Sequence, residues 1–196
     1  MHGPRSQRRH HAEVLADIAR FAGSSLELDD VLDRIVQRAA ELTGADRASI
    51  WLLDRAGQRL LPSALYGMDA AFTAAWKTRP LALVDESLSR EVLETGRPAI
   101  VVDAAADPRT DKGIVQFFGD RSILVAPLVS QGRVVGTLFL NHVRTHYRFT
   151  DEDVETTTAI ANQAAIAIDN ARLYGDTRRL AEQLRRSFRH AAGFSM

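Results

Sequence analysis

The chain has 196 residues, a length typical of one domain with helical extensions. Lys and Arg together number 25, and so do Asp and Glu, so no net charge favours a nucleic-acid or acidic-membrane partner. Because it contains no cysteine, the chain cannot form disulfides, thiolate zinc sites, iron–sulfur clusters, cysteine nucleophiles or thioether-linked chromophores, and its composition is typical of a reducing compartment.

The first part of the chain predicts a polar tail and then two helices. Residues 1–11 are polar and basic, and we expect a disordered tail there. Apolar residues then recur at helical spacing over residues 12–22 and again over residues 28–42, and Gly44 ends the second helix. No apolar run approaches the roughly 20 residues of a membrane span, and the N-terminus is not a secretory signal. We therefore expect a cytoplasmic protein, or a cytoplasmic fragment, that does not bind membranes.

The period of the apolar residues then changes from helical to alternating. Residues 48–54 (ASIWLLD) predict a strand with two usable faces, and residues 59–67 (RLLPSALYG) predict its hairpin partner. Residues 68–86 are mixed in pattern and predict no single element.

The middle of the chain predicts short elements. Residues 87–96 predict a helix with Ser87 as its N-cap and Gly96 at its end. A short strand follows at about residues 99–102, and residues 107–120 predict a loop with a short helix.

Two strands and a long helix are the clearest elements. Residues 122–129 and 133–143 alternate as strands do, and the Ser-Gln-Gly at 130–132 predicts a tight hairpin turn between them. Thr150 with Asp153 forms an acidic variant of the capping box, which predicts the start of the helix. The order of elements therefore predicts an α+β layer fold with an antiparallel sheet.

The apolar stripe of this last helix continues past residue 174. It runs through Leu180, Leu184 and Phe188 for about two heptads. Residues 175–196 are therefore predicted to be a helical extension or linker.

Two histidines, His142 and His146, are spaced as a helical metal site would need. The period of two in residues 133–143, however, places His142 at the end of a strand. Residues four apart in an extended chain lie roughly 13 Å from one another, too far for both to reach one zinc ion. We expect no metal site, and the acidic residues that follow are better explained as helix capping.

Four segments resemble a GAF domain in content and order: ADRASIWLLD, SREVLETGRPAIVVDAAADPR, SILVAPLVSQGRVVGTLFLNHV and FTDEDVETTTAIANQAAIAIDNARLY. The resemblance covers about residues 12–174. It implies a central antiparallel sheet of five to six strands, with the N- and C-terminal helices packed on one face. A small-molecule pocket would lie on the other face, and the C-terminal helix would be extended.

The resemblance implies a small-molecule-sensing and dimerising module of a cytosolic bacterial signal-transduction protein. Its implied partners are an unidentified small-molecule ligand, a second copy bound through the terminal helices, and an output domain or partner kinase, phosphatase, cyclase or transcription factor. One alternative is a structural dimerisation module that binds no ligand. Another is a regulatory domain that binds a cyclic nucleotide or haem.

The sequence lacks residues that several ligand classes of the family require. Nucleotide-binding members carry an Asn-Lys pair, then Phe and Asp-Glu, of which only Asn141, Phe149 and Asp153 are matched here, with Val154 in place of Glu. The loop of residues 107–121 lacks the histidine that haem-binding members use. Bilin attachment and methionine sulfoxide reduction both require cysteine. No nucleophile–base motif is present, so we expect neither an enzyme nor a bound cofactor.

By resemblance, the pocket would be lined by the side of the first strand that carries Ser49. The candidate residues are Ser49, Trp51, Tyr66, Trp76, Phe117, Phe118 and Phe139. Plain core packing is the alternative explanation, because aromatic residues at strand spacing are core residues first.

Overall fold

Strands and helices alternate along most of the chain. The computed structural model describes residues 28–192, and its side chains are described through Ala171 and at Leu173. The elements are α2 (Leu28–Thr43), β1 (Arg47–Leu53), β2 (Arg59–Tyr66), α3 (Ala70–Lys77), β3 (Leu81–Ala82), α4 (Ser87–Thr95), β4 (Ala99–Val101), α5 (Lys112–Phe118), β5 (Ser122–Ser130), β6 (Arg133–His142) and α6 (Asp151–Ala192). The predicted helix over residues 12–22 and the predicted tail lie outside the described residues.

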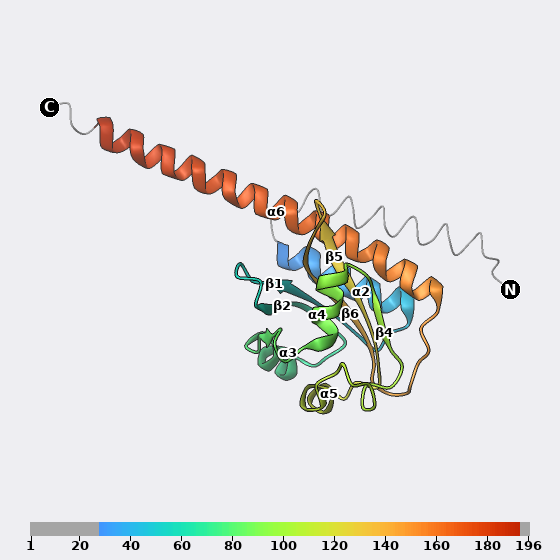
Figure 1. The fold of residues 1–196 in the computed structure, drawn as a ribbon. Helices are drawn as coiled ribbons and strands as arrows, with labels where there is room; N and C mark the ends of the chain where they lie inside the picture. The colour runs from blue at the N-terminus through green and yellow to red at the C-terminus, as the bar shows by residue number, and fades with distance from the viewer. Residues whose placement is uncertain (1–27, 193–196) are drawn as a thin grey trace.

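A six-stranded antiparallel sheet lies at the centre of the fold (Figure 1). Its strands are ordered β3-β2-β1-β6-β5-β4, so the two central strands, β1 and β6, come from the two hairpins of the chain. The β5–β6 turn is a two-residue loop in which Gln131 and Gly132 both have positive φ, as a type I′ hairpin turn requires. The predicted α+β fold is confirmed.

One face of the sheet packs against α2 and α6. Every second residue of β1 points to this side, and Ala48 and Ile50 are fully buried there together with Leu138 and Leu140 of β6. Figure 1 shows α2 and α6 side by side on this face, with α6 running far past the sheet. Each fully buried Leu or Ile contributes roughly 1.5–3 kcal/mol of stability, so this layer is the main core.

The opposite face is covered by α3, α4, α5 and their connections. The remaining residues of β1 point to this side, where Trp51 packs in a second core with Trp76 of α3, Val92 of α4 and Phe139 of β6. The sheet thus separates a helix-packed core from a second core under short elements, as the resemblance implies.

Two features of this second layer differ from the sequence predictions. Residues 68–86 contain α3, whose N-cap Asp69 accepts a hydrogen bond from the amide of Phe72, and the edge strand β3. The N-cap of α4 is Glu86, so the prediction of Ser87 is wrong by one residue. The nearby amide of Leu88 donates to the carbonyl of Arg109, so a loop supplies a partner that a capping side chain would otherwise provide. The predicted end of this helix at Gly96, in the left-handed conformation, is confirmed.

Candidate functional site

A small cavity of about 40 Å³ lies between the sheet and the layer of α3, α4 and α5. Its floor is formed by β1 and β6. From β1 come Arg47, Ser49 and Trp51, which alternate with the residues that face α2 and α6, and from β6 come Phe139 and Asn141. The strand period of two therefore places one polar and aromatic face of the sheet under the short helices.

Aromatic rings make up one wall of the cavity. The ring centroids of Trp51 and Trp76 lie 5.0 Å apart at an interplanar angle of 74°, and Phe139 packs edge-on against Trp51 at 6.5 Å. The indole N–H of Trp51 donates to the Ser49 hydroxyl at 3.0 Å. The indole N–H of Trp76 is buried and has no hydrogen-bond partner.

A buried ion pair joins the floor to the end of α5. The Arg47 guanidinium lies 3.5 Å from the Asp120 carboxylate, and both side chains are almost fully buried. Arg47 Nη2 donates to the carbonyl of Phe118 at 2.9 Å, whereas Arg47 Nε and Nη1 and one oxygen of Asp120 have no hydrogen-bond partner. Burial raises the pKa of Asp120 to about 6, although the charge of Arg47 and the Asn141 side chain act in the opposite direction.

A second buried carboxyl lies at the start of α4. Glu86 is only 6% exposed and accepts a hydrogen bond from the Ser89 hydroxyl at 3.3 Å. Burial, together with the smaller effect of the neighbouring charges of Asp111, Asp85 and Asp120, raises its pKa to about 7, although the hydrogen bond from Ser89 acts in the opposite direction. The cavity thus holds one guanidinium and two buried carboxyl groups.

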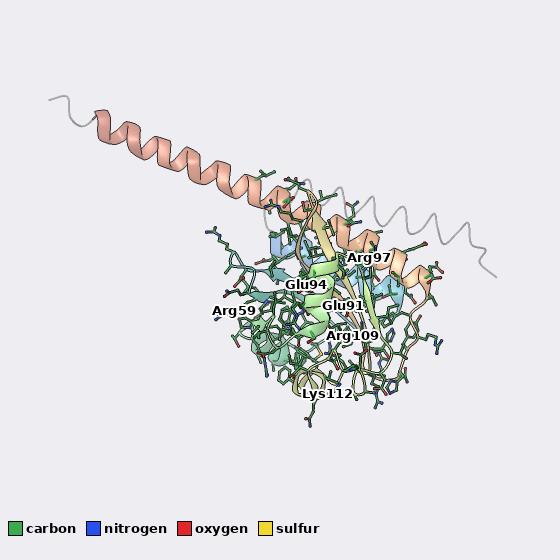
Figure 2. All side chains as sticks on the ribbon, in the orientation of Figure 1. Arg59, Glu91, Glu94, Arg97, Arg109 and Lys112 are labelled. Carbon is green, nitrogen blue, oxygen red and sulfur yellow. The ribbon has the colours of Figure 1, made fainter. Side chains whose placement is uncertain are left out.

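An arginine clamp holds the loop that covers this site. The guanidinium of Arg109 donates to Asp107 at 2.8 Å, to Glu91 of α4 at 3.2 Å and to the carbonyl of Ile100 in β4 at 2.9 Å. Hydrogen bonds and ion pairing with Arg109 lower the pKa of Asp107. Figure 2 shows Glu91 and Arg109 close together beside α4, with Lys112 at the start of α5. The clamp ties α4 and the edge of the sheet to the covering loop.

The structure brings most of the predicted pocket residues together. Ser49, Trp51, Trp76, Phe118 and Phe139 all line the cavity.

Tyr66 and Phe117 lie outside it. Tyr66 pairs with Ala48, which faces α2 and α6, because a bulge in the β1–β2 register between Ile50 and Trp51 reverses the side to which the end of β2 points. Phe117 is 39% exposed and packs against the rings of Phe72 and Phe118.

The three residues of the partial nucleotide motif lie apart. Asn141 lines the cavity. Phe149 is buried in the core on the α2–α6 face, and Asp153 caps α6 through reciprocal hydrogen bonds with Thr150, which confirms the predicted capping box. The match in sequence therefore does not correspond to one binding site.

The two histidines also have separate environments. His142 ends β6, as predicted, and stacks on Tyr147 at 4.1 Å, whereas Nδ1 of His146 lies 3.2 Å from the carbonyl of Val102. Among the side chains that the structure describes, no three His, Cys, Asp or Glu residues are grouped as a metal site would need. The part of the chain that the structure describes also has no helix long and apolar enough to cross a bilayer.

Sequence reasoning did not identify the charged residues of the cavity. Arg47, Glu86 and Asp120 adjoin turns or element ends, where charged residues are expected to be exposed. The alternation of β1 does indicate Arg47, because it lies two residues before Ser49 and so points to the same side of the strand as Ser49 and Trp51. The burial of Glu86 and Asp120 depends on how α4 and α5 pack, which no local pattern reveals.

Comparison with known proteins identifies relatives in signalling. The sequence model of the GAF domain matches residues 27–168. The chain is 33% identical over 98 residues to hybrid signal transduction histidine kinase G of Dictyostelium discoideum, across 50% of this chain and 3% of the kinase. It is 24% identical over 168 residues to dual 3′,5′-cyclic-AMP and -GMP phosphodiesterase 11A of Takifugu rubripes, across 78% of this chain and 19% of that protein. The chain thus spans less than a fifth of the length of these two relatives.

A solved structure shows the same fold. The GAF domain of a phosphoenolpyruvate-protein phosphotransferase from Coxiella burnetii superimposes with a TM-score of 0.72 at 22% identity. The superposition covers 85% of this chain and 96% of the other.

Proposed function

The chain belongs to the GAF domain family, and we propose that it is the small-molecule-sensing and dimerising module of a cytoplasmic bacterial signal-transduction protein. Its role is regulatory rather than catalytic. The ligand binds in the cavity between the sheet and α4 and α5, and a second copy binds along the terminal helices. The output domain or partner is of the kinase, phosphatase, cyclase or transcription-factor type.

The observation that carries this proposal is the unsatisfied polar interior of the cavity. Arg47 Nε and the indole N–H of Trp76 are buried without hydrogen-bond partners, and Arg47 Nη1 and one oxygen of Asp120 have only their mutual ion-pair contact at 3.5 Å, with no hydrogen bond. Each such group costs about 1–3 kcal/mol, and apolar residues of similar shape would avoid that cost. A module that serves only to dimerise has no use for this arrangement, so the cavity favours ligand binding over the ligand-free alternative.

The central strands offer a route from the cavity to the helices. Arg47, Ser49 and Trp51 face the cavity, and Ala48 and Ile50 between them pack against the core of α2 and α6. A shift of β1 on ligand binding therefore moves both layers, because close-packed cores transmit displacement.

Helix α6 supplies the dimerisation surface. Ile166 is 49% exposed and Leu173, seven residues later, is 61% exposed. Leu180 continues this seven-residue spacing in the sequence. A heptad stripe of this kind pairs with a second copy in a coiled coil.

The cavity argues against the cyclic-nucleotide and haem alternatives. A volume of about 40 Å³ is far below the size of a nucleotide or a porphyrin. Phe149 and Asp153, which nucleotide binding would use by resemblance, serve the helix-side core and the cap of α6.

The test combines sedimentation with a metabolite screen by thermal shift on the full chain. We expect a dimer whose melting temperature rises with at least one small metabolite. The double variant Arg47→Met/Asp120→Leu keeps the cavity filled with apolar groups and is expected to fold but to lose the response. Arg97→Met, at an exposed arginine just after α4, is the control and retains it. A monomer at high concentration contradicts the dimerising role, and a wild-type protein that responds to no metabolite contradicts the sensing role.

A further inference from the structure

The unpartnered donors of the cavity identify one end of its ligand. Arg47 Nε and Trp76 Nε1 are buried at a common cavity and have no hydrogen-bond partner among the described residues, and Arg47 Nη1 has only its ion-pair contact with Asp120 at 3.5 Å. A carboxylate accepts several hydrogen bonds at once and is the group that arginine binds most strongly. The ligand therefore needs a carboxylate or an equivalent acceptor at this end.

The buried acids identify the other end. One oxygen of Asp120 accepts no hydrogen bond and has only the 3.5 Å ion-pair contact with Arg47, and the Glu86 carboxyl accepts a hydrogen bond from the Ser89 hydroxyl. These two carboxyls and a single guanidinium line the same cavity, and Asp111 adds a third acid to the lining. A protonated amine supplies both the missing donors and the missing positive charge, and the rings of Trp51 and Trp76 favour a cation beside them.

The size of the cavity limits what can carry both groups. A buried water needs about 10–15 Å³, so 40 Å³ corresponds to about three waters and limits the ligand to a few heavy atoms. The smallest molecules of amino-acid type, glycine and alanine, are therefore the first to be considered. A simple anion would add to the excess of acids, and a simple amine would leave Arg47 and Trp76 unpartnered. A metal ion would lie against the guanidinium of Arg47, which repels it.

We propose that the cavity binds a small zwitterion of amino-acid type, with its carboxylate on Arg47 and Trp76 and its ammonium group between Asp120 and Glu86. This inference rests on the proposed sensing function and adds the chemical class of the ligand. A ligand with both charges pairs the buried groups of this cavity that form no hydrogen bond of their own.

Calorimetric titration of the full chain tests the ligand class. The probes are glycine and L-alanine, with acetate and ethylammonium as matched half-ligands. At pH 8 we expect at least one amino acid to bind at least tenfold more tightly than either half-ligand. Acetate or ethylammonium binding as tightly as the amino acids would overturn the proposal, and so would failure of both amino acids to bind.

Isosteric variants test the position of the ammonium group. Glu86→Gln and Asp120→Asn are each expected to weaken amino-acid binding at least tenfold. The control Glu94→Gln, on the exposed side of the same helix α4 (Figure 2), leaves it unchanged. Circular dichroism verifies that each variant is folded, and if Asp120→Asn does not fold, Glu86→Gln alone decides. Binding that neither variant weakens would overturn the assignment.

The pH dependence gives an independent readout. Because the pKa of Glu86 is about 7, this group is mostly ionised at pH 8 and mostly protonated at pH 6. Amino-acid affinity is therefore expected to fall about tenfold from pH 8 to pH 6, and Glu86→Gln should remove most of that change. An affinity that does not fall toward pH 6 would overturn the role given to Glu86.

Failure of the inference can be told apart from failure of the proposed function. If no probe binds but a metabolite of another class raises the melting temperature of the wild type and not of Arg47→Met/Asp120→Leu, the zwitterion is wrong and the sensing site stands. If no metabolite of any class has this effect, both are wrong.

Discussion

Replacing Glu86 by Gln is expected to stabilise the fold, and to do so only above the pH at which the buried carboxyl ionises. Burial holds the pKa of Glu86 at about 7, against 4.5 in the unfolded chain. A group whose pKa is raised on folding binds more protons in the folded state, so stability falls as pH rises between these two values. The difference corresponds to about 3 kcal/mol, lost progressively between about pH 4.5 and pH 7.

The substitution removes this ionisation and keeps the size of the side chain. At pH 8 we expect the free energy of unfolding of Glu86→Gln to exceed that of the wild type by about 2–3 kcal/mol. Below about pH 4, where Glu86 is protonated in both states, the two proteins should be nearly equal. The Ser89 hydroxyl can still donate to the amide oxygen that replaces the carboxyl, so this hydrogen bond is kept.

Urea unfolding at pH 4 and pH 8, followed by tryptophan fluorescence, measures both differences. The chain has only two tryptophans, and Trp51 and Trp76 both lie at the cavity, so the signal reports this layer directly. Glu94→Gln, exposed on the same helix, is the control and should change neither value by more than about 0.5 kcal/mol. A gain for Glu86→Gln that is equal at both pH values would refute the reasoning.

Three other substitutions test the packing around the site. Gly136→Ala should destabilise the fold by about 2–4 kcal/mol in thermal denaturation, because a Cβ at this position would lie 2.2 Å from the carbonyl oxygen of Trp51 in the adjacent strand; an unchanged melting temperature would contradict this close approach. Arg47→Met should cost about 3–5 kcal/mol in urea unfolding by leaving Asp120 buried and unpaired, and adding Asp120→Leu should recover most of the loss; equal losses in both variants would show that the pair is not coupled. Asp153→Ala should cost about 1 kcal/mol by removing the cap of α6, and no loss of stability would show that the cap is replaceable.

The periodic elements of the fold could be predicted because the spacing of their apolar residues indicates which side of each element is buried. The stripe of α2 and the alternation in β1, β5 and β6 arise from burial on one or both sides, which local sequence encodes. Helix α3 was not predicted, because eight residues give barely two turns of pattern and its start depends on the single cap Asp69.

The site could be predicted only where strand parity fixes it. Ser49 and Trp51 follow from the alternation of β1. The position of Tyr66 does not follow from strand alternation, because one bulge in the pairing of β1 with β2 reverses the side that the end of β2 faces. No residue type in the sequence indicates that bulge. Glu86 and Asp120 become buried through contacts between distant segments, so their charge alone predicts the wrong exposure.

The order of the chain has a consequence for how ligand preference can diverge. Residues 67–121 form one uninterrupted segment between the two hairpins, and it contains α3, α4 and α5 as well as both edge strands, β3 and β4. This segment therefore runs from one edge of the sheet to the other and covers the cavity. The helices α2 and α6, on the far face, lie outside it. Substitutions within residues 67–121, which include Trp76, Glu86 and Asp120, can therefore change the cavity while the sequences of α2 and α6 stay the same. Exchange of this segment between homologues is accordingly a direct way to transfer ligand specificity.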